Sequence, residues 1–381
     1  MTESFPRQQA RTRRFSLGLP RSFTVAPDGS RVAFLRSKGA DDPVTCLWQL
    51  HVETGQEELV ADPATLEPAG EDVSPQEKAR RERAREQAGG IVGFAADRAL
   101  SVAAFALAGR VYVAGLGPSG DEDDAGVREA AVGQTGPHPV GALAPAFDPR
   151  PDPTGTRVAY VHQGALHVTR IDGEARGAGD TSTADAANRD GADAARGDAA
   201  SRDGADAARG DAANGDGADA ARGDAASGAD AESIGDGDAS WADGAGVEDL
   251  VVAGPAGAPG LSYGAAEFIA AEEMGRMRGY WWAPDGGSLL VARVDETRVQ
   301  RWHIADPANP ARSPAAVAYP AAGTSNADVS LLLASLDGRR AEVDIDWAAF
   351  PYLVTVAWEA GGDPLIVVQS RDQRVMRLLT A

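Results

Sequence analysis

Two adjacent carboxylates, Glu272 and Glu273, stand a few residues before an aromatic run at 280–282, Tyr-Trp-Trp. The free α-amino group of a peptide has a pKa of about 7.7–8.0, so it is mostly an ammonium ion at neutral pH. Two carboxylates can hold such an ion from two sides through charge-assisted hydrogen bonds. The residue types and their spacing therefore predict a site that binds peptide N-termini.

The backbone that carries this pair must be helical or irregular, because adjacent side chains on a regular strand point to opposite faces. The preceding residues 265–271, Ala-Ala-Glu-Phe-Ile-Ala-Ala, favour helix formation and predict a short helical excursion. Alone, a pair of glutamates is typical of a solvated surface, since charged side chains are rarely buried. The surrounding residues give this pair its functional interpretation.

A second element, residues 74–88, is predicted to be a charged helix. Its first residues, Ser-Pro-Gln-Glu at 74–77, form a capping box with Pro at the first helical position, and two glycines at 89–90 end it. The only apolar residues within it are alanines, so we expect the helix to project into solvent or to lie over a cavity. Arg81 and Arg85 are four residues apart and share one face.

Negative charge is concentrated in residues 178–247, which hold fifteen Asp and one Glu against five Arg, a net charge of −11 out of −21 for the whole chain. A near-exact 13-residue repeat begins at Arg189 and again at Arg202. It contains almost no large apolar residues, so we expect a disordered insertion. The spacing of its Asp residues fits neither an EF-hand loop nor a β-roll repeat. A surface this acidic disfavours nucleic acid and anionic membranes as partners.

The single cysteine, Cys46, excludes an internal disulfide and is expected to be a buried structural thiol. No stretch approaches about 18 apolar residues, so no membrane span is expected and a cytoplasmic location is predicted. The histidines form no metal-ligating motif, and we expect no metal or cofactor. His162 and His167 are expected at the surface.

Outside the insertion, short strands alternate with turns. Residues 23–35 consist of a strand, a Pro-Asp-Gly turn and a second strand; the pattern recurs at 280–292 and more loosely at 146–161. Further strands are predicted at 46–52 and 110–114. The spacing favours four-stranded units in series and hence an all-β fold, a β-propeller. A generic β-sandwich is the alternative.

With these residues in view, the chain resembles the N-terminal propeller domain of the dipeptidyl peptidase IV family of prolyl-oligopeptidase-type serine peptidases, particularly bacterial members and the dipeptidyl peptidase 8 and 9 type. The resemblance rests on the double-Glu segment at 267–284, on Tyr-Pro-Ala-Ala-Gly-Thr-Ser-Asn at 319–326, and on Tyr352 and Trp358. It covers most of the chain apart from the insertion.

The resemblance implies that Glu272 and Glu273 bind the free amine of the substrate. It also implies that the 74–88 helix closes over the substrate, with Arg81 and Arg85 as candidate contacts to a substrate carbonyl. A merely solvated charged helix remains the alternative.

In that family the catalytic Ser-Asp-His triad lies in a C-terminal α/β-hydrolase domain, and the chain is expected to lack this domain. Gly-Leu-Ser-Tyr-Gly at 260–264 fits the nucleophile-elbow pattern, but a loop precedes it, and His303 is the only later histidine. We therefore expect Ser262 not to be a nucleophile and assign no catalytic residue.

The expected organisation is a first set of blades at 1–177, the insertion at 178–247, and further blades with the double-Glu segment at 248–381. About 310 residues outside the insertion, at roughly 40–50 per blade, make at most six or seven blades, so an incomplete propeller is expected. The predicted function is substrate recognition for a dipeptidyl peptidase whose hydrolase domain is downstream or separate. A non-catalytic peptide- or protein-binding propeller and a truncated gene product remain open, as does a homo-oligomer.

Overall fold

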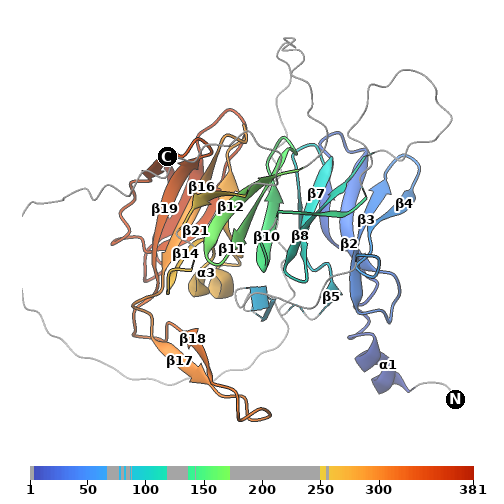
Figure 1. Ribbon diagram of the computed structural model, residues 1–381, viewed down its shortest axis with the longest axis horizontal. Coiled ribbons are helices and arrows are strands. Elements are labelled where there is room, and N and C mark those ends of the chain that lie inside the picture. The colour runs from blue at the N-terminus through green and yellow to red at the C-terminus, as the bar shows by residue number, and fades with distance from the viewer. Residues whose placement is uncertain are drawn as a thin grey trace, which may run out of the picture. The chain divides into compact units, whose positions relative to one another are not determined.

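The computed structural model describes residues 4–66, 77–78, 81–82, 86, 88–117, 136–141, 143–171, 249–254 and 257–381 (Figure 1). The predicted insertion at 178–247 lies outside the described residues. So do Arg85 and most of the predicted helix 74–88, of which residues 77–78 and 81–82 are described as helical.

The described strands form five antiparallel sheets that follow one another along the chain, and a separate hairpin. The first sheet contains β1 (Arg21–Val25), β2 (Arg31–Ser37), β3 (Val44–His51) and β4 (Gln56–Ala61), with the short β5 (Gly89–Gly90) parallel to β3. The second contains β6 (Phe94–Ala96), β7 (Val102–Leu107), β8 (Arg110–Gly115) and β9 (His138–Val140). The third contains β10 (Ala146–Pro151), β11 (Arg157–His162), β12 (Ala165–Arg170) and β13 (Leu250–Ala253).

The fourth sheet contains β14 (Leu261–Ala265), β15 (Arg278–Trp282), β16 (Ser288–Asp295), β19 (Asp328–Ser335) and β20 (Arg340–Glu342). Between β16 and β19 the chain forms the separate hairpin of β17 (Arg301–Ile304) and β18 (Ala315–Ala318). The fifth sheet contains β21 (Tyr352–Ala357), β22 (Leu365–Gln369) and β23 (Met376–Thr380). The predicted all-β class is confirmed, although the described strands include no closed sheet.

The recurring turn predicted from the sequence joins two consecutive strands of one sheet in each case: β1 and β2, β10 and β11, and β15 and β16. Gly29, Gly155 and Gly286 have φ angles of +72°, +69° and +71°, and each donates its N–H to the carbonyl three residues earlier. Glycine suits this position because residues with a Cβ are strained at positive φ. The three sequence copies are therefore three copies of one backbone geometry.

Four buried apolar clusters each join consecutive sheets, from the first and second to the fourth and fifth. In strand β16, alternate residues belong to two different clusters. Leu289 and Val291 pack with residues of the third sheet, whereas Leu290 and Ala292 pack with residues of the fifth. Successive side chains of a strand point to opposite faces, so a sheet buried on both sides has a nearly continuous apolar sequence.

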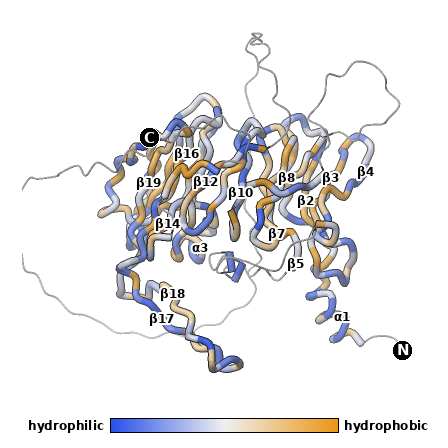
Figure 2. The backbone as a smooth tube through the Cα atoms, in the orientation of Figure 1, coloured by the Kyte–Doolittle hydropathy of each residue, from blue (hydrophilic) through white to orange (hydrophobic). Residues whose placement is uncertain are grey.

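Helix α1 and the β17–β18 hairpin are more exposed to solvent than the strands of the five sheets. Figure 2 shows hydrophobic residues along β7 and β8, whereas helix α1 (Phe5–Arg11) is mainly hydrophilic and buries none of its residues. In the β17–β18 hairpin, Trp302 and Ile304 are exposed. Within the described residues, no helix has the length and apolar composition needed to cross a bilayer.

Candidate functional site

The double-Glu segment is a short helix, α3 (Phe268–Glu273), inserted between β14 and β15. Its Ile269, Ala270 and Ala271 are buried, and this burial holds the helix in place despite its length of only six residues. Phe268 packs edge-on against Tyr319, with ring centroids 5.2 Å apart. The predicted helical excursion is therefore confirmed.

Glu272 and Glu273 are both exposed at the C-terminal end of α3. Glu273 accepts a hydrogen bond from the side chain of Gln373, Nε2 to Oε2 3.3 Å, so the turn between β22 and β23 reaches the pair. No basic residue lies in the last turn of the helix. Because the C-terminal end of a helix carries partial negative charge, both carboxylates lie where a cation is favoured.

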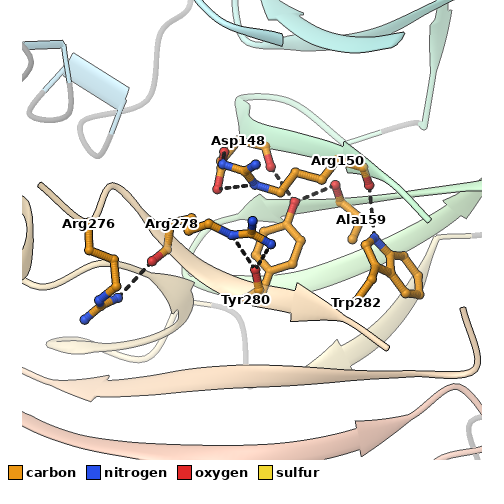
Figure 3. Close-up of polar contacts among 7 residues, drawn as sticks. All are labelled: Asp148, Arg150, Ala159, Arg276, Arg278, Tyr280 and Trp282. Atoms are coloured by element: carbon orange, nitrogen blue, oxygen red, sulfur yellow. Dashed lines mark hydrogen bonds and ion pairs between the residues drawn. The ribbon is translucent and has the colours of Figure 1, made fainter. Parts of the chain in front are cut away.

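A buried ion pair fixes the segment on either side of α3. Arg276 donates from Nη2 to Oε2 of Glu267 at 2.6 Å, and the two side chains are 3% and 4% exposed. Arg276 also donates from Nε to the carbonyl of Leu353 (3.1 Å) and from Nη1 to that of Arg278 (2.8 Å; Figure 3). Its guanidinium thus ties the residue before the helix, the strand after it and strand β21 to one another.

Tyr280, on β15, connects the same segment to the third sheet. It is fully buried, and its hydroxyl donates toward the carbonyls of Asp148 and Ala159 on β10 and β11 (Figure 3). Burial raises the pKa of Tyr280 well above its ordinary value, so the hydroxyl keeps its proton. Asp148 has a φ of +50° and lies where the β10–β11 register shifts, which marks a β-bulge.

Two arginines from different sheets line two cavities, the larger of which adjoins α3. Arg150 on β10 and Arg278 on β15 both border a cavity of about 500 Å³ and a second of about 280 Å³. Met274 and Gly275, which directly follow Glu273, line the larger one. Neither arginine was a candidate from the sequence.

Arg81, a candidate contact from the sequence, forms an ion pair with Glu77. Its Nε donates to Oε1 of Glu77, one helical turn earlier, at 2.8 Å, and the Glu77 side chain is buried. Arg85 lies outside the described residues. A role for either arginine in substrate binding stays a prediction.

Ser262, which we expect not to be a nucleophile, lies in a strand and not in a turn. Ser262 lies within β14, paired with Val294 on β16, whereas a nucleophile elbow is a turn between a strand and a helix. The prediction that His162 and His167 lie at the surface is wrong: they are 7% and 4% exposed. Their rings pack 5.8 Å apart because β11 and β12 form a hairpin that is buried between neighbouring sheets.

The remaining predictions concern the single cysteine and metal binding. Cys46 is buried as predicted, and burial raises its pKa to about 11. The described residues hold no cluster of three His, Cys, Asp or Glu side chains that could ligate a metal ion.

Fold and site together define an all-β chain of serial antiparallel sheets in which a short helix presents two exposed glutamates. Residues 249–381 match the family described as the dipeptidyl peptidase IV (DPP IV) N-terminal region. This part of the chain is similar to an N-terminal domain of the DPP IV type, and over these residues the resemblance inferred from the sequence is confirmed. Glu272 and Glu273 fall inside the matched residues, whereas Arg81 and Arg85 precede them.

Among solved structures, the chain is similar to the crystal structure of Porphyromonas gingivalis dipeptidyl peptidase 4, with a TM-score of 0.52 and 14% sequence identity. The match covers 95% of this chain and 38% of that one, so the chain spans well under half the length of the protein it resembles. At this identity the likeness shows a shared fold.

Sequence reasoning missed the residues that hold the site together. Glu267 and Arg276 belong to the quoted motif, but the eight residues between them hide their contact. Arg150 and Arg278 are 128 positions apart and come together only through the packing of two sheets. The signal for Arg150 is the preceding Pro149, because proline within a strand marks an edge or a bulge.

Proposed function

We propose that this chain is the substrate-recognition part of a serine-type dipeptidyl peptidase, with Glu272 and Glu273 binding the N-terminal ammonium of a peptide. The observation that carries the proposal is the exposure of both carboxylates at one end of α3, within the residues that match the DPP IV N-terminal region. The helix end adds its own partial negative charge to theirs. A cationic amine suits this environment, and an anion does not.

The surroundings of the pair support binding with little rearrangement. The buried Arg276–Glu267 ion pair and the apolar side of α3 fix the backbone on both sides of the carboxylates. A site whose supporting groups are already ordered loses less conformational entropy when a ligand binds. Arg81 and Arg85 remain candidate contacts to a carbonyl of the same peptide.

Cleavage in this proposal belongs to an α/β-hydrolase partner, downstream or separate. An amine held at a fixed position, at a set distance from a serine nucleophile, makes the length of the released fragment a matter of geometry. The chain by itself is then a cytoplasmic peptide-binding module without turnover.

We also propose that the sheets are blades of a propeller, with 1–177 and 248–381 contributing blades on either side of the insertion at 178–247. Support comes from the two cavities that Arg150 and Arg278 border. Residues of β6, β10 and β15 line the smaller one, and residues of β10, β15 and β21 line the larger. Strands from four consecutive sheets therefore border shared space, as the inner strands of blades do around a central channel.

The amine site is tested by the affinity of a fluorescent peptide with a free N-terminus and of its N-acetylated form. Glu272→Gln and Glu273→Gln should each weaken binding of the free-amine peptide by about tenfold or more, since a hydrogen bond to a charged group contributes about 1.5–3 kcal/mol. Acetylation should weaken binding to the unmodified chain to a similar extent.

Glu53→Gln is the matched control, because Glu53 is an exposed glutamate in the turn between β3 and β4. It should bind both peptides as the unmodified chain does. Equal affinity for free and acetylated peptides, or unchanged affinity in both site variants, would rule out the proposed anchor.

A further inference from the structure

The larger cavity, beside α3, is lined by cationic side chains. Among the described residues that line it are three arginines, Arg150, Arg276 and Arg278, and no Asp or Glu. The chain as a whole has a net charge of −21. A locally cationic cavity in an acidic protein attracts anions and concentrates them against the general field.

Two of the three arginines already have carboxylate partners. Arg276 is paired with Glu267, and Arg150 binds Asp148 through Nε at 3.2 Å and Nη2 at 2.8 Å. Arg278 differs: it donates from Nε at 3.1 Å and Nη2 at 2.9 Å to the carbonyl of Tyr280. Within the described part of the chain, no carboxylate forms an ion pair with Arg278, so its positive charge is not neutralised by direct contact.

This unneutralised charge is held in a fixed position. The Arg278 guanidinium lies 5.4 Å from the ring centroid of Trp281, and the carbonyl of Tyr280 fixes its orientation (Figure 3). Burial, and secondly the charge of Arg150, lower the pKa of Arg278 to about 9, so the group is still charged at pH 7. A bound anion would offset both effects, because it supplies the missing opposite charge.

The second cationic group, Arg150, directly follows the bulge in β10. The positive φ of Asp148 and the shifted register next to it change the direction of the strand just before Arg150. The Tyr280 hydroxyl holds that bulge through the Asp148 carbonyl (Figure 3). One buried tyrosine of β15 therefore supports both Arg150 and, through its own carbonyl, Arg278.

We propose that this cavity is an anion subsite that binds a carboxylate, and that its ligand is an acidic side chain of a peptide whose free amine is held by Glu272 and Glu273. The guanidinium of Arg278 makes the principal contact, and Arg150 contributes a second positive charge. The affinity of the cavity for an anion is inferred from its arginines alone, whereas its occupation by a peptide rests on the proposed function.

The position of the acidic residue follows from the chain path. Met274 and Gly275 line the cavity and come directly after Glu273, so the amine site and the cavity are adjacent along the backbone. An extended peptide advances about 3.3 Å per residue, so an acidic residue two to four positions from the amine is the appropriate probe. The ligand class is thus a peptide with a free amine and Asp or Glu close behind it.

The test measures the affinity of dye-labelled pentapeptides that carry Glu or Gln at position two, three or four, each with a free or an acetylated N-terminus. The unmodified chain should prefer Glu over Gln by about tenfold or more at one of these positions, as expected for a charge-assisted hydrogen bond. Arg278→Met should abolish this preference, while Arg278→Lys should retain part of it.

Arg298→Met is the control, because it removes one positive charge from an exposed arginine that is paired with Asp328 on the same sheet. It should keep the full preference for Glu. Arg278→Met removes two hydrogen bonds to the Tyr280 carbonyl but breaks no ion pair within the described residues, so it should lower the unfolding temperature by no more than a few degrees.

The two proposals fail differently. If free-amine peptides bind better than acetylated ones but Glu and Gln bind equally at all three positions, the anion subsite is wrong and the amine anchor stands. If the Glu preference survives Arg278→Met, the cavity is not its source and the inference is overturned. If acetylation has no effect while Glu is preferred and Arg278→Met removes that preference, the anion site stands and the amine anchor fails.

Discussion

The two ends of helix α3 carry carboxylates in opposite circumstances. Glu267, just before the helix, is buried and paired with Arg276, whereas Glu272 and Glu273, at the other end, are exposed. A buried carboxylate needs a charged partner because desolvation is expensive, and an exposed one does not. The first end therefore contributes to the fold, and the second is the end to which we assign the ligand.

The largest expected effect comes from breaking the buried pair. Arg276→Met leaves Glu267 without its partner in a water-poor environment and should lower the free energy of unfolding by about 3–5 kcal/mol. Urea denaturation followed by tryptophan fluorescence measures this loss. A loss below about 1 kcal/mol would show that the pair contributes little to stability.

The double variant Glu267→Gln with Arg276→Met sharpens the result. It removes both charges, so it should recover part of the stability lost in the single variant. No recovery would mean that the two carbonyl bonds of Arg276, to Leu353 and Arg278, account for the loss instead of the ion pair.

A smaller effect is expected at Tyr280, which links this segment to the third sheet. Tyr280→Phe removes the hydroxyl that serves the carbonyls of Asp148 and Ala159 and should cost about 1–3 kcal/mol, because buried acceptors lose their donor. Tyr263→Phe is the control, since Tyr263 packs in the same apolar cluster and its hydroxyl has no hydrogen bond to any residue that the structure describes. Equal stability of the two variants would contradict the role given to the Tyr280 hydroxyl.

The repeated turns show which parts of the fold the sequence could predict. Three copies carry glycine at the positive-φ position and were recognised from that residue. The second sheet has the same turn at 97–100, where Leu100 takes a φ of +53° and donates its N–H to the carbonyl of Asp97. With no glycine or proline to mark it, this copy could be found only from the structure. Asp97 accepts hydrogen bonds from the N–H groups of Ser101 and Val102, as Asp152 does from those of Thr156 and Arg157 in the third sheet.

The residues of the candidate site also divide into those that the sequence could suggest and those that only the structure reveals. The two glutamates were predictable because their chemistry is local: two adjacent carboxylates and a helix-forming run. Arg150 and Arg278 were not, because each is an ordinary strand residue until two sheets pack together and a bulge changes the direction of one strand. Apart from Pro149 before Arg150, these two residues leave no short-range pattern in the sequence, because they act through the packing of sheets.

The smallest expected effect completes the comparison of the two helix ends. Glu272→Gln and Glu273→Gln should change the free energy of unfolding by no more than about 0.5 kcal/mol, because exposed side chains away from caps and buried networks contribute little. Any change should be a gain, since removing negative charge from a helix C-terminus relieves repulsion with the partial charge of its carbonyls. The same urea denaturation measures it.

These two variants are the ones proposed to lose peptide binding, so an unchanged stability matters for interpretation. A large loss of affinity with an intact fold assigns the carboxylates to the ligand. If either substitution instead destabilised the chain by more than about 1 kcal/mol, that glutamate would belong with Glu267 as a structural residue. The functional contrast between the two ends of α3 would then disappear.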